Sequence, residues 1–241
     1  MEPIRILYED RHLLLCVKPV GVLSQPSPTE STGDMLSLLQ EQCNLPYVGL
    51  VHRLDRGVGG LMVFAKTQAA AGKLSAAVAD RSMTKEYLAL VHGTPDPEAG
   101  ELRDLLYKDA ARGRSFVVDR MRAGVKEAKL LYRTVAHIPA TPDGADALSL
   151  VQVHLLTGRT HQIRVQFSSR KMPLYGDGKY GARDHGPIGL WSYRLCFAHP
   201  FEKKKTVDVS CLPPTEHQAF SLLGQTDWQQ RLSSDAFSGE F

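Results

Sequence analysis

The sequence of 241 residues lacks the usual markers of a metal or cofactor site. It contains only four cysteines, far apart, and they form neither a Cys-x-x-Cys pair nor a Cys/His cluster. Zinc sites and disulfide frameworks are therefore not expected, and the cysteines are expected to be reduced thiols. No Gly-x-Gly-x-x-Gly or Walker-type loop occurs, which excludes the common nucleotide-binding motifs. The chemistry must then come from side chains, with no metal and no cofactor.

Long apolar runs are also missing. No run reaches the roughly 18 residues that a membrane-spanning helix needs, and the first residues lack the basic start and apolar stretch of a signal peptide. We therefore expect a cytoplasmic protein that does not associate with membranes. Hydrophobic residues make up 43% of the chain, enough for a substantial core, and the length fits one large domain or two small lobes.

The net charge of +3 is unevenly distributed along the chain. Between Lys108 and Arg133, eight Lys or Arg residues stand against three Asp or Glu residues, so the remainder is slightly acidic. Basic residues gathered in one segment suit a phosphate backbone, whose counterions they displace. The alternative is a solvated loop and hairpin face.

One carboxylate lies in an unusual setting between two apolar runs. Asp55 has Arg53 and Arg56 beside it, and the glycines that follow at 57, 59 and 60 allow a tight backbone path into an apolar run that ends at Ala65. That run is typical of a buried strand, and loops next to strands often carry functional residues. Taken alone, the cluster is also compatible with an ordinary salt-bridged turn.

Hydrophobic spacing and turn residues predict more strands than helices. Helices are expected from Asp34 through Cys43, from Thr67 through Asp80, from about Thr160 to Lys171, and from Glu216 to Leu223. On the third helix, His161 and Arg164 are expected to share a charged face opposite a packing face. The strands are expected over residues 4–10, 12–19, 60–65, 83–92, 129–138, 147–156, 190–198 and 206–211, and residues 175–187 are expected to be loop.

Several short blocks occur together in one order along the chain. They are His52-Arg53-Leu54-Asp55 with Gly60, Lys18-Pro19-x-Gly21, Lys85-x-Tyr87-x-Ala89-x-Val91-x-Gly93, Leu156-Thr157-Gly158-Arg159-Thr160-His161-Gln162-Ile163-Arg164, Gly176-Asp177-x-x-Tyr180-Gly181 and Leu195-x-Phe197-x-His199-Pro200. Together they resemble the RluA family of RNA pseudouridine synthases, from Ile4 to about Leu212. There are departures: Val58 and Gly59 stand where the family pattern has Thr and Ser, and Gln166 replaces a frequent His.

This resemblance implies an α+β fold, the pseudouridine synthase fold, with a long, mixed, mostly antiparallel sheet, helices packed around it and a central catalytic cleft. It implies one catalytic domain over residues 1–225, formed by two lobes and without an N-terminal RNA-binding domain. Residues 226–241 are expected to be a weakly structured tail. We expect a monomer that needs no obligatory protein partner.

The function implied is an RNA pseudouridine synthase, an isomerase that acts on uridines of ribosomal or transfer RNA. The resemblance makes Asp55 the essential catalytic group, Tyr87 the ring at the target uracil, and Arg164 the partner of the catalytic carboxylate. Whether Asp55 attacks as a nucleophile or removes a proton from the ribose 2′ carbon stays open. The target base must also be flipped out of its stack.

Other residues are assigned to RNA binding and to support of the site. Those expected to bind RNA are Arg53, Arg56, Lys85, Arg112, Arg114, Arg120, Arg122, Lys179 and Arg183, and Arg53 is the candidate for filling the vacated stack. Those expected to support the site structurally are His52, Arg159 and His161.

Two alternative functions use the same residues differently. One is an RNA-binding or ribosome-assembly protein on this scaffold, in which catalysis is secondary or lost. The other is a metal-dependent nuclease or phosphodiesterase that uses Asp55, Asp177 and a histidine, but no paired-carboxylate motif supports it.

Overall fold

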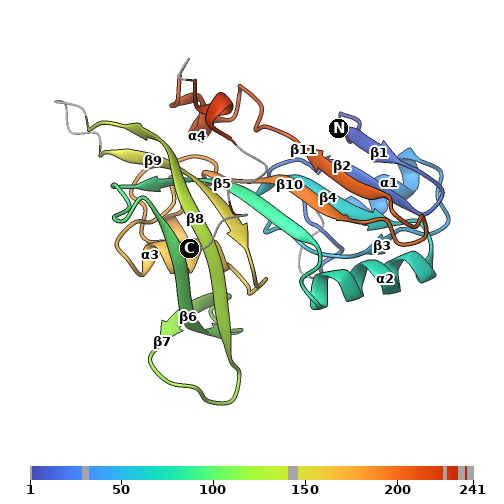
Figure 1. Ribbon diagram of the computed structural model, residues 1–241, viewed down its shortest axis with the longest axis horizontal. Coiled ribbons are helices and arrows are strands. Elements are labelled where there is room, and N and C mark those ends of the chain that lie inside the picture. Colours follow the sequence, from blue (N-terminus) through green and yellow to red (C-terminus); the bar gives the residue numbers. More distant parts are fainter. Residues whose placement is uncertain (1, 29–32, 141–145, 225–226, 233–236, 238–241) are drawn as a thin grey trace. The chain divides into compact units, whose positions relative to one another are not determined.

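The computed structural model describes residues 2–28, 33–140, 146–224, 227–232 and 237 (Figure 1). The chain forms two compact units. Unit 1 comprises Met1–Lys85 and Trp191–Pro213, and unit 2 comprises Glu86–Leu190 and Pro214–Phe241. The positions of the two units relative to one another are not determined, so each is described by itself.

Unit 1 is built on a mixed sheet. Strand β2 pairs antiparallel with β1 and β4, β4 pairs antiparallel with β3 and parallel with β10, and β10 pairs antiparallel with β11. Every residue of β4 is buried, which confirms the buried strand predicted after the Asp55 loop. The strands are β1 (Ile6–Glu9), β2 (Leu13–Lys18), β3 (Gly49–Leu50), β4 (Gly59–Ala65), β10 (Leu190–Ala198) and β11 (Thr206–Ser210).

The two helices of unit 1 begin at the predicted caps. Helix α1 (Met35–Gln42) follows Asp34, whose carboxylate accepts hydrogen bonds from the second and third amides of the helix. Helix α2 (Gln68–Ala79) follows Thr67, whose hydroxyl accepts the amide of Ala70 at 3.2 Å. Each cap satisfies amides that have no partner within the helix, which is why these polar residues fix the helix starts.

Unit 2 is built on antiparallel strands. Their order across the sheet is β5, β9, β8, β6 and β7, so β6 forms a hairpin with β7 and pairs with β8 along its other edge (Figure 1). The basic segment from Lys108 to Arg133 therefore lies on the β6–β7 turn, on β7, and on the β7–β8 turn and the strand that follows it. The strands are β5 (Thr84–His92), β6 (Ala99–Asp109), β7 (Arg114–Val118), β8 (Val125–Ile138) and β9 (Leu148–Leu155).

Helix α3 (Gln162–Ser168) is shorter than the predicted helix from about Thr160 to Lys171. His161 and Lys171 adopt left-handed backbone conformations, with φ of 55° and 62°, and this conformation is incompatible with a continuing right-handed helix. All residues from Gln162 to Phe167 are buried. The expectation of a charged face opposite a packing face is therefore wrong, because Arg164 is only 5% exposed.

The remaining helical segments of unit 2 are short. Residues 175–187, expected to be loop, contain the 3₁₀ helix η1 (Gly178–Tyr180), and the predicted last helix is reduced to α4 (Gln218–Ser221). Within the expected tail, η2 (Asp227–Arg231) buries Trp228, and residues 233–236 and 238–241 lie outside the described part. The predicted α+β class with a mixed, mostly antiparallel sheet is confirmed.

Candidate active site

The Asp55 loop of unit 1 connects β3 to β4 and is held by hydrogen bonds to its main chain. The amide of Val58 donates to the carbonyl of Asp55 at 3.0 Å, which closes a tight turn around the carboxylate. On the preceding side, the hydroxyl of Ser24 donates to the Leu54 carbonyl at 2.8 Å and accepts the Leu54 amide at 3.1 Å. Buried Val58 takes the position of the family's threonine without a hydroxyl. The loop is thus anchored on both sides of Asp55.

A buried lysine anchors the next residue of the same loop. The Lys18 ammonium donates to the carbonyls of Val22 at 2.7 Å, Pro19 at 2.8 Å and Arg56 at 3.3 Å. The Gly21 amide also donates to the Arg56 carbonyl, at 2.8 Å. Burial lowers the pKa of Lys18 to about 8, although the negative charge of Asp55 opposes this shift. The Lys18-Pro19-x-Gly21 block therefore holds the Asp55 loop through hydrogen bonds to the Arg56 carbonyl, a role that the sequence did not predict.

The glycines at the start of β4 are required by close backbone and ring contacts. A Cβ on Gly60 would lie 2.3 Å from the backbone oxygen of Ser192, and its φ of +114° disfavours any side chain. A Cβ on Gly59 would lie 2.4 Å from the Trp191 ring. The departure from the family pattern at Gly59 therefore has a steric cause, because the Trp191 ring occupies the space that a serine side chain needs.

His52 contacts strand β4 through its ring. Its Nε2 accepts the amide of Val63 at 3.2 Å, and its Nδ1 is buried without a partner among the described residues. Desolvation, together with the positive charge of Lys85, lowers the pKa of His52 to about 3, so the ring is neutral. The flanking Arg53 and Arg56 are exposed, and the Arg56 Nε donates to the Gly21 carbonyl at 3.1 Å.

Unit 2 contains the other two residues assigned to catalysis. Tyr87 lies on β5 opposite Val153 of β9 and is 6% exposed. Arg164 lies on α3, where its Nε and Nη2 donate to the two carboxylate oxygens of Asp177 at 2.7 and 2.8 Å. Because the relative positions of the units are not determined, the expected approach of Asp55 to Tyr87 and Arg164 stays a prediction.

The residues around Arg164 form a connected cluster in unit 2. The hydroxyl of Tyr180 accepts the Ser115 amide at 2.9 Å and lies 2.9 Å from Nδ1 of His161. The Tyr180 ring lies under the Arg164 guanidinium, with 5.1 Å between the guanidinium carbon and the ring centroid. Arg159 is bound elsewhere, because its Nε donates to the Glu127 carbonyl at 2.9 Å.

Several of the predicted RNA-binding residues lie on or beside the β6–β7 hairpin of unit 2. The Lys179 ammonium donates to the Gly113 carbonyl at 3.1 Å, so the loop after α3 meets the β6–β7 turn that carries Arg112. Arg114 lies over the rings of Phe116 and Tyr180, at 5.4 and 4.7 Å from their centroids. Lys179 thus lies against the β6–β7 turn, and Arg114 lies against the ring of Tyr180.

The remaining cations of this group are exposed. Arg122 lies 5.3 Å from the centroid of the Tyr107 ring, and Arg120 is on the same β7–β8 turn. Arg183 borders a pocket of about 320 Å³ whose other walls include His92, Lys171 and Tyr180. Lys85, in contrast, is 8% exposed, and burial lowers its pKa. Lys85 is thus the least accessible member of the predicted RNA-binding set.

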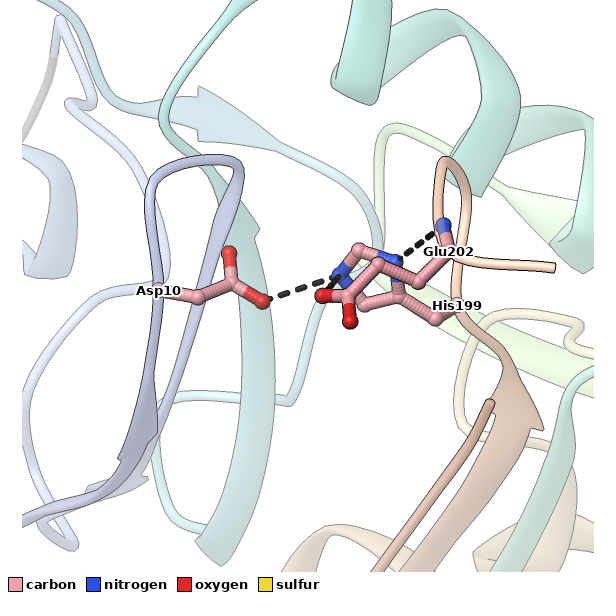
Figure 2. A group of neighbouring side chains, drawn as sticks. All are labelled: Asp10, His199 and Glu202. Atoms are coloured by element: carbon pink, nitrogen blue, oxygen red, sulfur yellow. Dashed lines mark hydrogen bonds and ion pairs between the residues drawn. The ribbon is translucent and has the colours of Figure 1, made fainter. Parts of the chain in front are cut away.

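A cluster of Asp10, His199 and Glu202 in unit 1 has the residue types of a cation site (Figure 2). Its hydrogen bonds favour another interpretation. The Nδ1 of His199 accepts the amides of Glu202 at 2.8 Å and Phe201 at 3.3 Å, so the ring proton is on Nε2, which donates to Asp10 at 2.9 Å. A protonated Nε2 has no lone pair for a metal.

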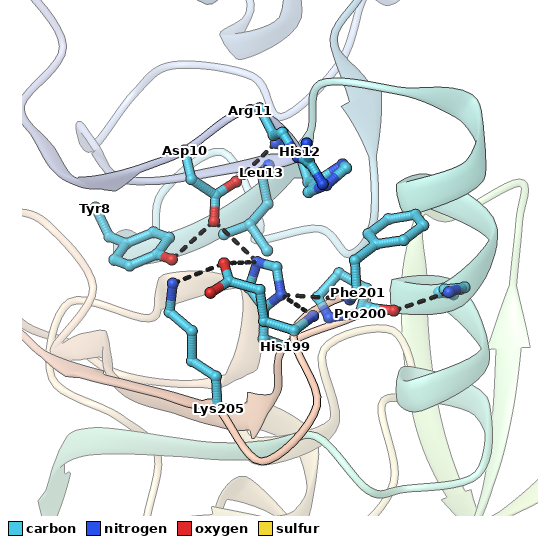
Figure 3. Close-up of polar contacts among 11 residues, drawn as sticks. Tyr8, Asp10, Arg11, His12, Leu13, His199, Pro200, Phe201 and Lys205 are labelled. Atoms are coloured by element: carbon cyan, nitrogen blue, oxygen red, sulfur yellow. Dashed lines mark hydrogen bonds and ion pairs between the residues drawn. The ribbon is translucent and has the colours of Figure 1, made fainter.

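Asp10 is the centre of this network (Figure 3). Its carboxylate also accepts the Tyr8 hydroxyl at 2.7 Å and the amides of His12 at 2.7 Å and Leu13 at 3.0 Å. Burial opposes ionisation, but these hydrogen bonds outweigh it and hold the pKa of Asp10 well below its ordinary value. The network ties the β1–β2 turn to the β10–β11 turn.

No described helix is long and apolar enough to span a membrane.

Comparisons with known proteins point to one family. A sequence profile of the family described as RNA pseudouridylate synthase matches residues 12–169. Ribosomal large subunit pseudouridine synthase D of Neisseria meningitidis is 30% identical over 95% of the chain and 67% of the relative. The protein of the same name from Pseudomonas aeruginosa is 36% identical over 75% of the chain and 54% of the relative. The chain thus spans about half to two thirds of the length of these relatives.

Solved structures support the fold. The structure described as human RNA pseudouridylate synthase domain containing 1 has a TM-score of 0.72 and 24% identity, covering 92% of this chain and 90% of that one. The structure described as human RNA pseudouridylate synthase domain containing 4 has a TM-score of 0.71 and 21% identity, covering 91% and 92%.

Proposed function

Since the chain belongs to the RNA pseudouridylate synthase family, in its RluA branch, we propose that it converts uridine to pseudouridine in RNA. The single observation that carries this proposal is the family match over residues 12–169, which includes the Asp55 loop, Tyr87 and Arg164. The names of the relatives from Neisseria meningitidis and Pseudomonas aeruginosa favour ribosomal RNA of the large subunit over transfer RNA as substrate.

The reaction is an isomerisation that requires neither an oxidant nor a reductant. The bond between N1 of uracil and C1′ of ribose breaks, the base rotates, C5 bonds to C1′, and C5 loses a proton while N1 gains one. Asp55 starts the reaction in its ionised form, either as a nucleophile or as the base at C2′. Its anchored loop supports this role, because a fixed carboxylate avoids the cost of orientation during the reaction.

Tyr87 and Arg164 are proposed to complete the site. Tyr87 stacks on the flipped uracil or removes the C5 proton after the base rejoins. Arg164 pairs with the Asp55 carboxylate, keeping it charged and oriented. The buried positions of Tyr87 and Arg164 support these roles, because electrostatic and stacking interactions are stronger where water is excluded.

RNA binding is assigned mainly to cations of unit 2, which are exposed except for the partly buried Arg114. Arg112, Arg114, Arg120, Arg122, Lys179 and Arg183 would contact phosphates on both sides of the flipped nucleotide. Arg53, exposed beside Asp55, would fill the space that the base leaves, and Arg56 would contact the neighbouring phosphate. We assign Lys85 to this set only through its place on β5, because its ammonium is nearly buried. His52, Arg159 and His161 would support the site.

The protein is proposed to act in the cytoplasm as a monomer without an obligatory protein partner. Among the described residues, the exposed large hydrophobic side chains are Val20, Met121, Leu212 and Leu222, and this small number supports a monomer. Light scattering combined with size-exclusion chromatography tests this state, since a mass of twice 26.6 kDa would contradict it.

The decisive experiment measures tritium release from RNA labelled at uracil C5. Wild-type protein is expected to release tritium, and Asp55→Asn to release at least about a hundredfold less, the scale of an essential acid or base. Asp80→Asn, which neutralises an exposed carboxylate of the same unit, is the matched control and should retain full activity.

A measurement of RNA binding distinguishes a pseudouridine synthase from a protein that only binds RNA. Asp55→Asn is expected to bind RNA as tightly as wild type, because the substitution leaves the cationic surface intact. Tight binding by wild-type protein without any tritium release would favour the RNA-binding or ribosome-assembly alternative. Release that persists undiminished in Asp55→Asn would remove the role assigned to Asp55.

A further inference from the structure

The Gly176-Asp177-x-x-Tyr180-Gly181 segment has no part in the reaction as proposed above. We infer that Asp177 and Tyr180 are positioning residues that hold the guanidinium of Arg164 in the orientation needed for catalysis. This inference rests on the proposed function, because Arg164 is assigned to the site there. It gives the segment a role that residue types and spacing alone do not suggest.

The ion pair between Asp177 and Arg164 fixes one edge of the guanidinium. Asp177 is 1% exposed and accepts the Nε proton at 2.7 Å and an Nη2 proton at 2.8 Å. A bidentate contact of this kind sets the plane and the direction of an arginine, whereas a single contact does not. The other N–H bonds then lie on the far edge of the guanidinium, which is the edge proposed to meet Asp55.

Tyr180 fixes the face of the same guanidinium. Its ring lies 5.1 Å from the guanidinium carbon, within the range of a cation–π contact. The ring cannot easily turn, because its hydroxyl is bound by the Ser115 amide and by His161. Arg164 is therefore restrained by a carboxylate at its edge and by an aromatic ring against its face.

The backbone of the loop holds both residues in place. The Asp177 carbonyl accepts the amides of Tyr180 at 2.9 Å and Ala182 at 3.2 Å, and the Tyr180 carbonyl accepts the Ser168 hydroxyl at 2.6 Å. Gly176 has a φ of +72°, and a Cβ there would lie 2.6 Å from the Pro187 carbonyl oxygen. The two positioning side chains are thus carried on a loop whose path permits little adjustment.

A purely structural role for this ion pair is a weaker explanation. Buried ion pairs contribute little net stability compared with apolar side chains of the same size, because both charges lose their hydration. A second Asp–Arg pair of unit 2, Asp104 with Arg170, is more accessible and also bidentate, at 2.9 and 3.2 Å. The Asp104–Arg170 pair is therefore a matched control: it has the same chemistry, but its arginine has no assigned catalytic role.

Steady-state kinetics of Asp177→Asn test the inference. We expect kcat to fall about a hundredfold, the scale of a displacement of about 1 Å in the placement of a reacting group, with KM changed by less than about threefold. Asp104→Asn should leave both constants near their wild-type values. Equal kcat in Asp177→Asn and wild type would overturn the inference, as would an effect confined to KM.

A spectroscopic measurement gives a readout that is independent of activity. In ¹⁵N-labelled protein the Nε–H of Arg164 should be protected from exchange with water, because it is buried in the ion pair, and Asp177→Asn should abolish this protection. Protection that survives in Asp177→Asn would show that the carboxylate does not hold the guanidinium. Arg164→Lys identifies the resonance by its disappearance.

Tyr180 supplies a second series in case Asp177→Asn does not fold. Tyr180→Phe keeps the ring under Arg164 and should keep most of the wild-type kcat, whereas Tyr180→Leu removes the ring and should reduce kcat about tenfold or more, as in other cases of impaired orientation. Similar kcat values for the two variants would contradict the role of the ring. Failure of the proposed function is distinguishable, because wild-type protein would then form no pseudouridine while the exchange measurement on Arg164 would still give its expected result.

Discussion

The two units place their charged site residues by different means. In unit 1, hydrogen bonds to the main chain hold the Asp55 loop, made by the Ser24 hydroxyl, the buried Lys18 ammonium and two backbone amides. In unit 2, Arg164 is held by side chains, the Asp177 carboxylate and the Tyr180 ring. The loop of unit 1 therefore depends on close backbone approach, and the cluster of unit 2 depends on ionised and aromatic partners.

Because of this difference, we expect the two units to respond differently to a rise in pH. The pKa of Lys18 is lowered to about 8 by burial, so its contacts can change within an accessible pH range. An arginine stays protonated under all ordinary conditions, so the Arg164 contacts are not lost as the pH rises. Four predictions test this contrast, beginning with the largest expected effect.

Gly60→Ala should be the most damaging single change in unit 1. The new Cβ would lie 2.3 Å from the Ser192 backbone oxygen, at a φ of +114°. The combined strain and overpacking should cost about 4 kcal/mol in free energy of unfolding. Gly72→Ala in α2 is the control: its Cβ meets nothing within 4 Å, and removal of a helical glycine should stabilise the protein by about 0.5–1 kcal/mol.

Urea denaturation of both variants measures these changes. If Gly60→Ala were as stable as wild type, the close approach of β4 to Ser192 would not restrict the Asp55 loop. The contrast between a backbone-held unit and a side-chain-held unit would then fail.

Alkaline titration tests the buried lysine. The pKa of Lys18 is about 8 in the folded protein against an ordinary value of 10.5, so the unfolded chain binds more protons between these values. The contribution of this group to stability therefore rises with pH across that window, by up to about 3 kcal/mol. Over the same range the three Lys18 hydrogen bonds, including the one to the Arg56 carbonyl of the Asp55 loop, are no longer donated by a charged group, and synthase activity should fall.

The comparison of wild type with Lys18→Met isolates this effect. The difference between their free energies of unfolding, measured in urea from pH 7 to pH 10.5, should change with the sign given above. A constant difference across this range would show that Lys18 does not titrate there.

Asp10→Asn tests whether a carboxylate outside the Asp55 loop contributes to the stability of unit 1. The pKa of Asp10 is held below its ordinary value, so its contribution to stability is complete above about pH 4 and disappears as the pH falls through the folded pKa. At neutral pH the substitution should cost roughly 2 kcal/mol, typical of hydrogen bonds to a charged group. Thermal unfolding between pH 2 and pH 7 should show the variant and wild type converging in acid.

The smallest effect on folding is expected at the exposed cations of unit 2. Arg120→Ala combined with Arg122→Ala should change the free energy of unfolding by less than about 0.5 kcal/mol. The same variant should bind RNA more weakly, and the slope of log affinity against log salt should decrease by about 0.7 for each phosphate that the protein no longer neutralises. Lys203→Ala with Lys204→Ala, an equal reduction of charge in unit 1, should leave the slope unchanged.

Local patterns in the sequence predicted much of the fold. The caps at Asp34 and Thr67 and the buried strand before Ala65 depend on neighbouring residues, and all three are confirmed. The predicted length of α3 was wrong. The left-handed backbone conformations of His161 and Lys171 end the helix, and their residue types do not indicate these conformations.

The contacts that define the candidate site were harder to predict. Lys18 ends a strand and would ordinarily be solvated, but it is buried and one of the carbonyls that its ammonium binds is 38 residues away. Asp177 is separated from Arg164 by a turn and a change of direction, so no periodicity links them. Such contacts are set by tertiary packing, which the spacing of residues along the chain does not contain.

The contact between Gly59 and Trp191 also constrains how related sequences can diverge. A serine at position 59, as in the family pattern, is sterically excluded while the indole is present, so the two positions are expected to vary together. Gly59→Ser should be harmful alone and tolerated when Trp191 is replaced by a smaller residue. In the evolution of this chain, Trp191 would therefore have to be replaced by a smaller residue before serine could be accepted at position 59.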